Sequence, residues 1–166
     1  QPFQQIVPRI PLLLGTSTSF THTGLIGGTA YSYRVCASDA AGNTSTGATA
    51  SATPSAPDTT PPAAVTNLAG SNVSYTTVDL AWTAPGDDGA SGQASSYQLR
   101  YSTSSITASN WNSATPLTGL PSPKPAGGTE TFSVSGLAAK TTYYFAVRTL
   151  DDVSNLSPLS NVVNVT

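Results

Sequence analysis

Charged side chains are scarce in this sequence. Lys, Arg, Asp and Glu together make up 8% of its 166 residues, against roughly 25% in ordinary globular chains. The polar surface must therefore come from Ser, Thr, Asn, Gln and Gly. The net charge is −2 and no basic run occurs. Both facts argue against a nucleic-acid partner, because that binding depends on clustered Lys and Arg against phosphates.

Long apolar runs are also missing from the sequence. No stretch reaches the ~20 residues that a membrane span needs. The longest candidate, IVPRIPLLLG at 6–15, contains two prolines and an arginine. It also lacks the charged leader and the small-residue cleavage site of a signal peptide. We therefore expect no membrane span, and we expect any export signal to have been removed or to lie upstream.

Cysteine and histidine each occur once, as Cys36 and His22. A single cysteine allows no internal disulfide, and no Cys/His cluster is available to hold zinc. His22 has no second base and no nucleophile grouped with it, so a catalytic triad has nothing to be built from. The sequence therefore predicts a non-enzymatic protein with no cofactor.

The sequence contains an internal repeat with an offset of 112 residues. Setting residue n against n+112 aligns 19–45 with 131–157 without a gap, so that Leu25 falls on Leu137 and Tyr31 on Tyr143. A period near 110 indicates two copies of a whole domain, because solenoid units are shorter.

Hydrophobic residues alternate with polar ones in several short segments. Two such segments place their large side chains on one face, namely Val78, Leu80 and Trp82 in 77–82 and Tyr97, Leu99 and Tyr101 in 96–101. Period two is typical of strands with one buried face. Clusters of Gly, Pro, Ser and Asp separate these segments at turn spacing. The sequence therefore predicts an all-β, antiparallel β-sandwich.

Several motifs of the second copy, at about 62–166, occur together and in order. They are a Pro-rich start (TTPPAAVTNL), a Trp strand (VDLAW) followed by TAPGDDG, a Tyr-led strand (YQLRYS), NW, a Leu-x5-Tyr step and a last strand, SNVVNVT. In this combination the copy resembles a fibronectin type III domain over its whole length, and it is similar to the bacterial variety. The resemblance implies an immunoglobulin-like fold and a secreted or cell-surface location.

The resemblance also implies structural roles for particular residues. Tyr143, and Tyr31 in the first copy, would lie near the start of strand F and hydrogen-bond to backbone a few residues upstream. Leu137 and Leu25 would plug the end of the core. Trp82 and Tyr97 would lie on the strands that build the core and would have a structural role.

The first copy is shorter than the second. Position 1 aligns with position 113, so only the last strands, E, F and G, are expected in 1–53, behind an N-terminal apolar arm. Residues 54–61 are predicted to be a stiff, extended, Pro-rich linker, and 62–166 the complete module. A half-sandwich would leave strand edges unpaired, which invites other chains.

The sequence allows three explanations for the first copy, in which only part of a sandwich is expected. The chain can be a fragment whose upstream strands are absent, or another subunit can supply the strands by β-augmentation. Alternatively, residues 1–18 fold back, although the prolines in QQIVPRIPLLL confine it to an edge or a bulge. The expected partners are therefore proteins, either upstream polypeptide or neighbouring subunits, with polysaccharide as a further candidate.

Acidic residues gather in two loops that the resemblance places at one end of the sandwich. GDDG contributes Asp87 and Asp88, and DDVSN contributes Asp151, Asp152 and Asn155. Oxygen ligands of this kind suit Ca²⁺, so a weak calcium site is one interpretation. The other is that Asp and Asn bond their own backbone in turns.

A second group of residues comprises candidates for interaction. Trp111 lies in the polar segment SNWNS, where it either stacks on a sugar or partner or packs along a sheet edge. Tyr144 is expected to face outward beside Arg100 and Arg148, as a cation–π ladder or as a binding face. Cys36 is expected on the outward face of its strand, where it either cross-links or lies beneath a contact as a small hydrophobe.

These features predict an extracellular, non-enzymatic structural or interaction module. It would act as a spacer or as a strand-complemented subunit of a surface or filament assembly. The alternative is an accessory domain of a secreted hydrolase, with a spacer role or a weak affinity for carbohydrate.

Overall fold

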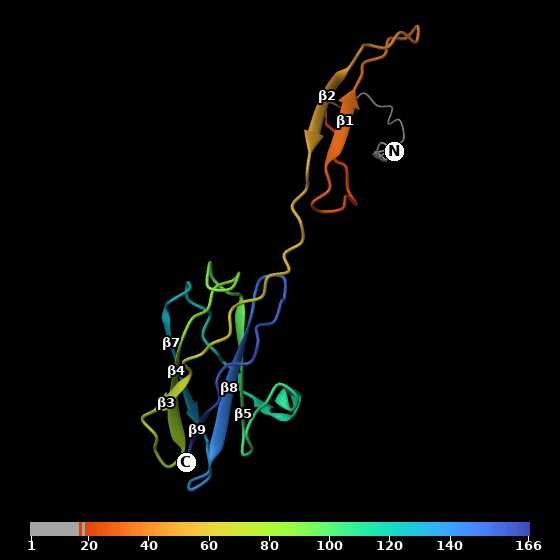
Figure 1. Ribbon diagram of the computed structural model, residues 1–166. Helices are drawn as coiled ribbons and strands as arrows, with labels where there is room; N and C mark the ends of the chain where they lie inside the picture. The colour runs from red at the N-terminus through yellow and green to blue at the C-terminus, as the bar shows by residue number, and fades with distance from the viewer. Residues whose placement is uncertain (1–16, 18) are drawn as a thin grey trace, which may run out of the picture. The chain divides into compact units, whose positions relative to one another are not determined.

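The computed structural model describes residue 17 and residues 19–166 (Figure 1). The chain divides into two units, Gln1–Asp58 and Thr59–Thr166. The boundary falls in the Pro-rich segment 54–61, which contains no helix or strand. The apolar arm expected at 1–18, with its suggested fold-back, lies outside the described residues apart from Ser17.

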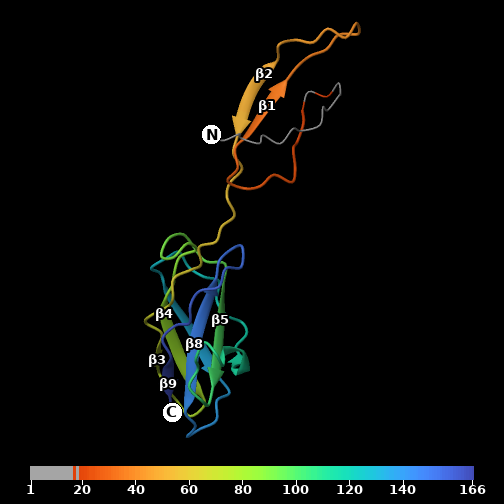
Figure 2. The same cartoon turned by 45° about the vertical axis from the view of Figure 1, so that its right-hand side comes forward.

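The second unit, Thr59–Thr166, is a sandwich of two antiparallel sheets (Figures 1 and 2). One sheet has the order β3-β4-β7, with β3 at Ala69–Ser71, β4 at Thr77–Thr83 and β7 at Thr129–Ser135. The other has the order β6-β5-β8-β9, with β5 at Ser96–Ser102, β6 at Thr115–Pro116, β8 at Tyr143–Leu150 and β9 at Val163–Val165. One turn of 3-10 helix, η1, covers Trp111–Ser113. The predicted all-β, antiparallel fold is confirmed.

The core lies between these sheets and follows the alternation in the sequence. Val78, Leu80 and Trp82 of β4 are buried, as are Phe145 and Val147 of β8. Each large apolar side chain that is fully buried stabilises the fold by roughly 1.5–3 kcal/mol. The rings of Trp82 and Tyr97 meet edge to face with centroids 5.1 Å apart, an arrangement that aromatic pairs prefer.

A polar group closes one side of this core. Burial raises the pKa of the Tyr97 phenol to about 12, so the hydroxyl stays protonated and donates to Glu130 Oε1 at 3.4 Å. The buried Glu130 also accepts the Lys124 backbone N–H at 2.6 Å. The Lys124 ammonium lies 3.6 Å from Glu130 Oε2. One carboxylate oxygen therefore accepts two hydrogen bonds and the other faces an ammonium group, so the buried charge is paired, as it must be.

The described part of the first unit contains a single two-stranded ribbon. β1 (Tyr31–Val35) pairs with β2 (Ala48–Ala52), with Tyr31 opposite Ala52. The third strand predicted for this copy, strand E, is wrong, because the described residues up to 30 contain no strand. In the second unit the equivalent strand, β7, is held by β4, with Phe132 opposite Leu80. The described part of the first unit offers no such neighbour.

The Leu-x5-Tyr step has the same geometry in both copies. The Tyr143 hydroxyl accepts the Ala138 N–H at 3.1 Å, and the Tyr31 hydroxyl accepts the Ile26 N–H at 2.9 Å. Each acceptor therefore lies five residues after its donor, as the resemblance implied. Leu137 is buried at the edge of the core, whereas Leu25 is half-buried.

Replacing Tyr143 by Phe should destabilise the second unit by about 0.5–1.5 kcal/mol, because the ring is kept and one hydrogen bond is lost. The free energy of unfolding from urea titration measures this change. Tyr31→Phe is the matched control, since it removes the same bond in the first unit and should leave the transition of the second unit unaltered. A Tyr143→Phe variant of unchanged stability would contradict a stabilising role for this bond.

Candidate functional site

The loop after β8 is organised by the buried side chain of Asp151. Its Oδ1 accepts the backbone N–H groups of Val153 at 3.1 Å and Asn155 at 2.6 Å. Its Oδ2 accepts the side-chain amide of Asn155 at 2.7 Å. Both carboxylate oxygens thus bind donors of their own loop.

The first copy has the same loop after β1. Asp39 Oδ1 accepts the N–H groups of Ala41 at 3.0 Å and Asn43 at 2.8 Å, and its Oδ2 accepts the Asn43 side-chain amide at 2.8 Å. These bonds, the Asn43 side chain foremost, lower the pKa of Asp39. The first copy has no described counterpart of the 86–92 loop, so turn formation is sufficient to explain an Asp–Asn pair at this position.

The two acidic loops of the second unit do meet at one end of the sandwich. Carboxylate oxygens of Asp87 and Asp152 lie within 4.8 Å of one another. Asp88 is exposed and forms a bridge with Ser91 within its own loop. A weak calcium site at this end stays a prediction, and a melting-temperature shift in a calcium titration is the measurement that tests it.

Trp111 is only 3% exposed and lies over the outer face of the β6-β5-β8-β9 sheet, against Ile106, Ala114 and Ala146. The guanidinium carbons of Arg100 and Arg148 lie 5.1 Å and 5.5 Å from the centre of its ring. One of the two interpretations of the sequence made Tyr144 the aromatic ring of this cation–π ladder. Trp111 takes that place, because η1 carries it back over β8, and Tyr144 packs against the same cluster.

Arg100 is fixed in this cluster by further bonds. It donates to the carbonyl oxygens of Trp111 at 3.2 Å and Ala114 at 3.3 Å. The connection between β5 and β6 is thereby tied to the sheet. An interaction role for these two arginines and for Tyr144 stays a prediction, since the contacts described are internal to the module.

Cys36 follows the last residue of β1 and is an exposed, free thiol. Both interpretations of Cys36, a cross-link or a small hydrophobe beneath a contact, stay predictions. His22 lies beside the aromatic residues of the first unit, with Nδ1 3.2 Å from the Tyr33 hydroxyl.

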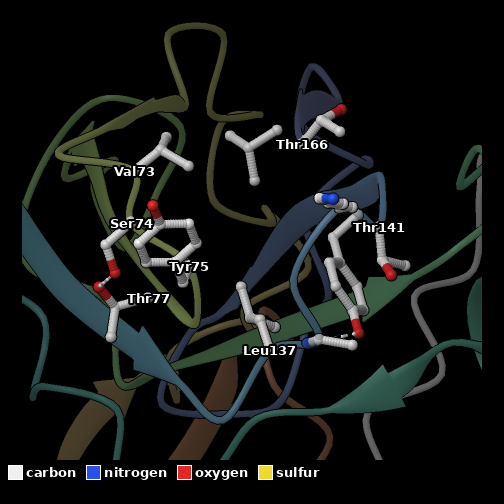
Figure 3. A pocket seen from close by; sticks show the side chains of 11 residues that line it. Val73, Ser74, Tyr75, Thr77, Leu137, Thr141 and Thr166 are labelled. Atoms are coloured by element: carbon white, nitrogen blue, oxygen red, sulfur yellow. Dashed lines mark hydrogen bonds between the residues drawn. The ribbon is translucent and has the colours of Figure 1, made fainter.

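A pocket of about 590 Å³, which was not predicted from the sequence, lies at the other end of the sandwich (Figure 3). β4 and β8 both begin there and end beside the acidic loops. The pocket lies between segments 73–77 and 137–143, next to Val165 and Thr166. Tyr75 on its rim is 85% exposed. An aromatic residue inside the polar turn SNVSYTT was the available signal.

Asp151→Ala should lower the free energy of unfolding of the second unit by roughly 3 kcal/mol, because the buried carboxylate accepts three hydrogen bonds from its loop and all three are lost. Urea unfolding of the whole chain measures the loss. Asp39→Ala removes the equivalent bonds in the first unit and should leave the same transition in place. Equal effects of the two variants on that transition would contradict the structural role of Asp151.

Comparisons with known proteins agree with this architecture. The profile of the Fibronectin type III domain matches residues 63–166. Exoglucanase B of Cellulomonas fimi is 33% identical over 155 residues, which cover 91% of this chain and 12% of that protein. Chitinase A1 of Niallia circulans is 37% identical over 156 residues, which cover 90% of this chain and 19% of the chitinase. Endoglucanase B of Cellulomonas fimi is 35% identical over 154 residues, which cover 91% of this chain and 13% of the endoglucanase.

The chain therefore spans less than a fifth of the length of these curated relatives. None of the helices among the described residues is long and apolar enough to cross a membrane. The sandwich with sheet orders β3-β4-β7 and β6-β5-β8-β9, the tyrosine bond before β8 and the match over 63–166 lead to one conclusion. The chain belongs to the fibronectin type III domain family.

Proposed function

We propose that the chain is a non-catalytic spacer module of a secreted polysaccharide-degrading enzyme. One observation carries this proposal: the similarity to a glucanase and a chitinase covers 91% and 90% of this chain, yet only 12% and 19% of those proteins. The similarity thus extends over most of both units of the chain. It involves a minor part of each enzyme, as expected for an accessory region.

The chemistry of the described residues supports a non-catalytic role. His22 lies in hydrogen-bonding reach of Tyr33, and the buried Glu130 is occupied by Lys124 and Tyr97. Neither group is paired with a nucleophile and an acid–base partner in the arrangement that hydrolysis needs. The Pro-rich segment 54–61 supports a spacer, because proline favours extended backbone with little entropy to lose.

A strand-complemented module is the second candidate, and the exposed C-terminal end of β1 favours it; Tyr31 at the start of the same strand is buried. Val35 of β1 is 74% exposed, whereas the equivalent Val147 of β8 is 0% exposed. Phe20, which aligns with Phe132, is also exposed. In this candidate, strands from the rest of the polypeptide or from a neighbouring subunit cover these exposed residues. The spacer role is compatible with it, because a completed first copy would be a second sandwich in series.

The spacer proposal predicts the outcome of a fusion experiment. The chain is placed between a glucanase catalytic domain and a cellulose-binding domain, and a Gly/Ser segment of equal length is the control. Hydrolysis of insoluble cellulose should be faster with the chain than with the flexible segment, since a stiff spacer holds its ends apart. Hydrolysis of a soluble substrate should be equal. Equal rates on the insoluble substrate, or sugar release by the chain alone, would count against the proposal.

The open face of β1 can be tested with strands of the chain itself. Joining residues 59–130 directly to Ser19, at the aligned position of the repeat, gives the first copy a set of facing strands from the second copy. Hydrogen exchange of the amides in 31–35 should slow, and a second cooperative unfolding transition should appear, because the new sheet buries Val35.

Val35→Asp provides the matched control for this hybrid. It should abolish the added protection in the hybrid, where the side chain is buried, and leave the parent chain unaffected, where Val35 is 74% exposed. If the amides of 31–35 exchange equally fast in the hybrid and in the parent chain, the face of β1 that carries Val35 does not bind a complementing sheet.

A further inference from the structure

We propose that the pocket between segments 73–77 and 137–143 binds a neutral hexopyranose unit of a polysaccharide. This inference rests on the proposed role in a polysaccharide-degrading enzyme and names the ligand that the module itself would contact. The pocket lies wholly within the second unit, and its volume of about 590 Å³ falls in the range of roughly 300–1,000 Å³ typical of small-molecule sites.

The base and one wall of the pocket are held by the fold itself. The Leu137 N–H donates to the Thr76 carbonyl oxygen at 3.1 Å, which joins the two loops. The Tyr143 hydroxyl accepts the Ala138 N–H at 3.1 Å and fixes the second loop. Leu137 is part of the core cluster. The pocket is therefore formed without a ligand, which lowers the free-energy cost of binding.

The pocket combines an aromatic ring with hydroxyl groups. In Figure 3, Val73 and Tyr75 lie on one side, Thr141 and Thr166 on the other, and Leu137 between them. Ser74 and Thr77 add two more hydroxyls, which lie 2.7 Å apart. Hydroxyls both donate and accept hydrogen bonds, and an exposed tyrosine has an apolar face with a polar tip.

These groups match the surface of a pyranose ring, which has an apolar C–H face and a rim of hydroxyls. No acidic side chain lines the pocket, and Lys140 is the one charged side chain among the lining residues. A ligand without charge therefore fits better than a cation. Because one exposed ring and a few hydroxyls make the contact, a dissociation constant on the order of 1 mM is expected.

Amide NMR shifts of the whole chain, titrated with cellopentaose and separately with chitopentaose, test the inference. Saturable shifts should be confined to 73–77, 137–143 and the neighbouring 165–166. Tyr75→Ala should weaken binding at least tenfold, whereas Tyr75→Phe should keep most of it, because the ring face is retained. Val153→Ala is the matched control: it removes a side chain that is 53% exposed at the opposite end and should bind like the parent. Unchanged melting temperatures confirm that the variants are folded.

Four results would overturn the inference. The first is that neither sugar causes a saturable shift, and the second is that binding survives Tyr75→Ala. The third is binding that weakens steeply with added salt, which indicates an anion at Lys140. The fourth is the same shifts on concentrating the chain alone, which indicates a contact between copies. Release of reducing ends in the titration sample would contradict the non-catalytic role instead, so the two failures are distinguishable.

Discussion

The packing of β4 against β8 is the constraint on which the structure depends. Trp82 and Leu80 from one sheet and Phe145 and Val147 from the other exclude water from a common core. Burial of this apolar surface is the main favourable term in forming the sandwich. The first copy shows what the same local sequence does without a described facing sheet. Its ribbon forms, yet Val35 is exposed where Val147 is buried.

The comparison of the two copies distinguishes features that form from local interactions from features that need a distant partner strand. The tyrosine bond and the Asp–Asn loop form in both copies, because each closes within about five residues of chain. The strand equivalent to β7 forms only where β4 can pair with it. The register differs as well: Tyr143 lies opposite Val165, whereas Tyr31 lies opposite Ala52 and not the equivalent Thr53. Register is weakly specified where little surface is buried. In this ribbon β1 buries only Tyr31 and β2 is exposed throughout, so the one-residue difference follows from the same cause.

This division explains how much the sequence could predict. The alternation in 77–82 and 96–101 predicted the strands and buried faces of β4 and β5, and the repeat of Leu-x5-Tyr located the start of β8. Strand E of the first copy was wrong, because alternation and alignment do not test for a partner. The ring between Arg100 and Arg148 was assigned to Tyr144, since the path of 105–114 back over β8 is a tertiary feature. The pocket was missed for the same reason, because it is formed by two loops, 73–77 and 137–143, that are far apart in the sequence.

The two ends of the sandwich differ in how their polar groups are used. At one end, the carboxylate of Asp151 is occupied by donors of its own loop. A ligand there would have to compete with bonds that hold the turn. At the other end, the tyrosine bond and the Leu137–Thr76 bond fix the backbone, so Tyr75 is not needed to support the fold and remains largely exposed. A ligand at the end where β4 and β8 begin can therefore contact Tyr75, which is 85% exposed, without breaking the bonds that hold these loops.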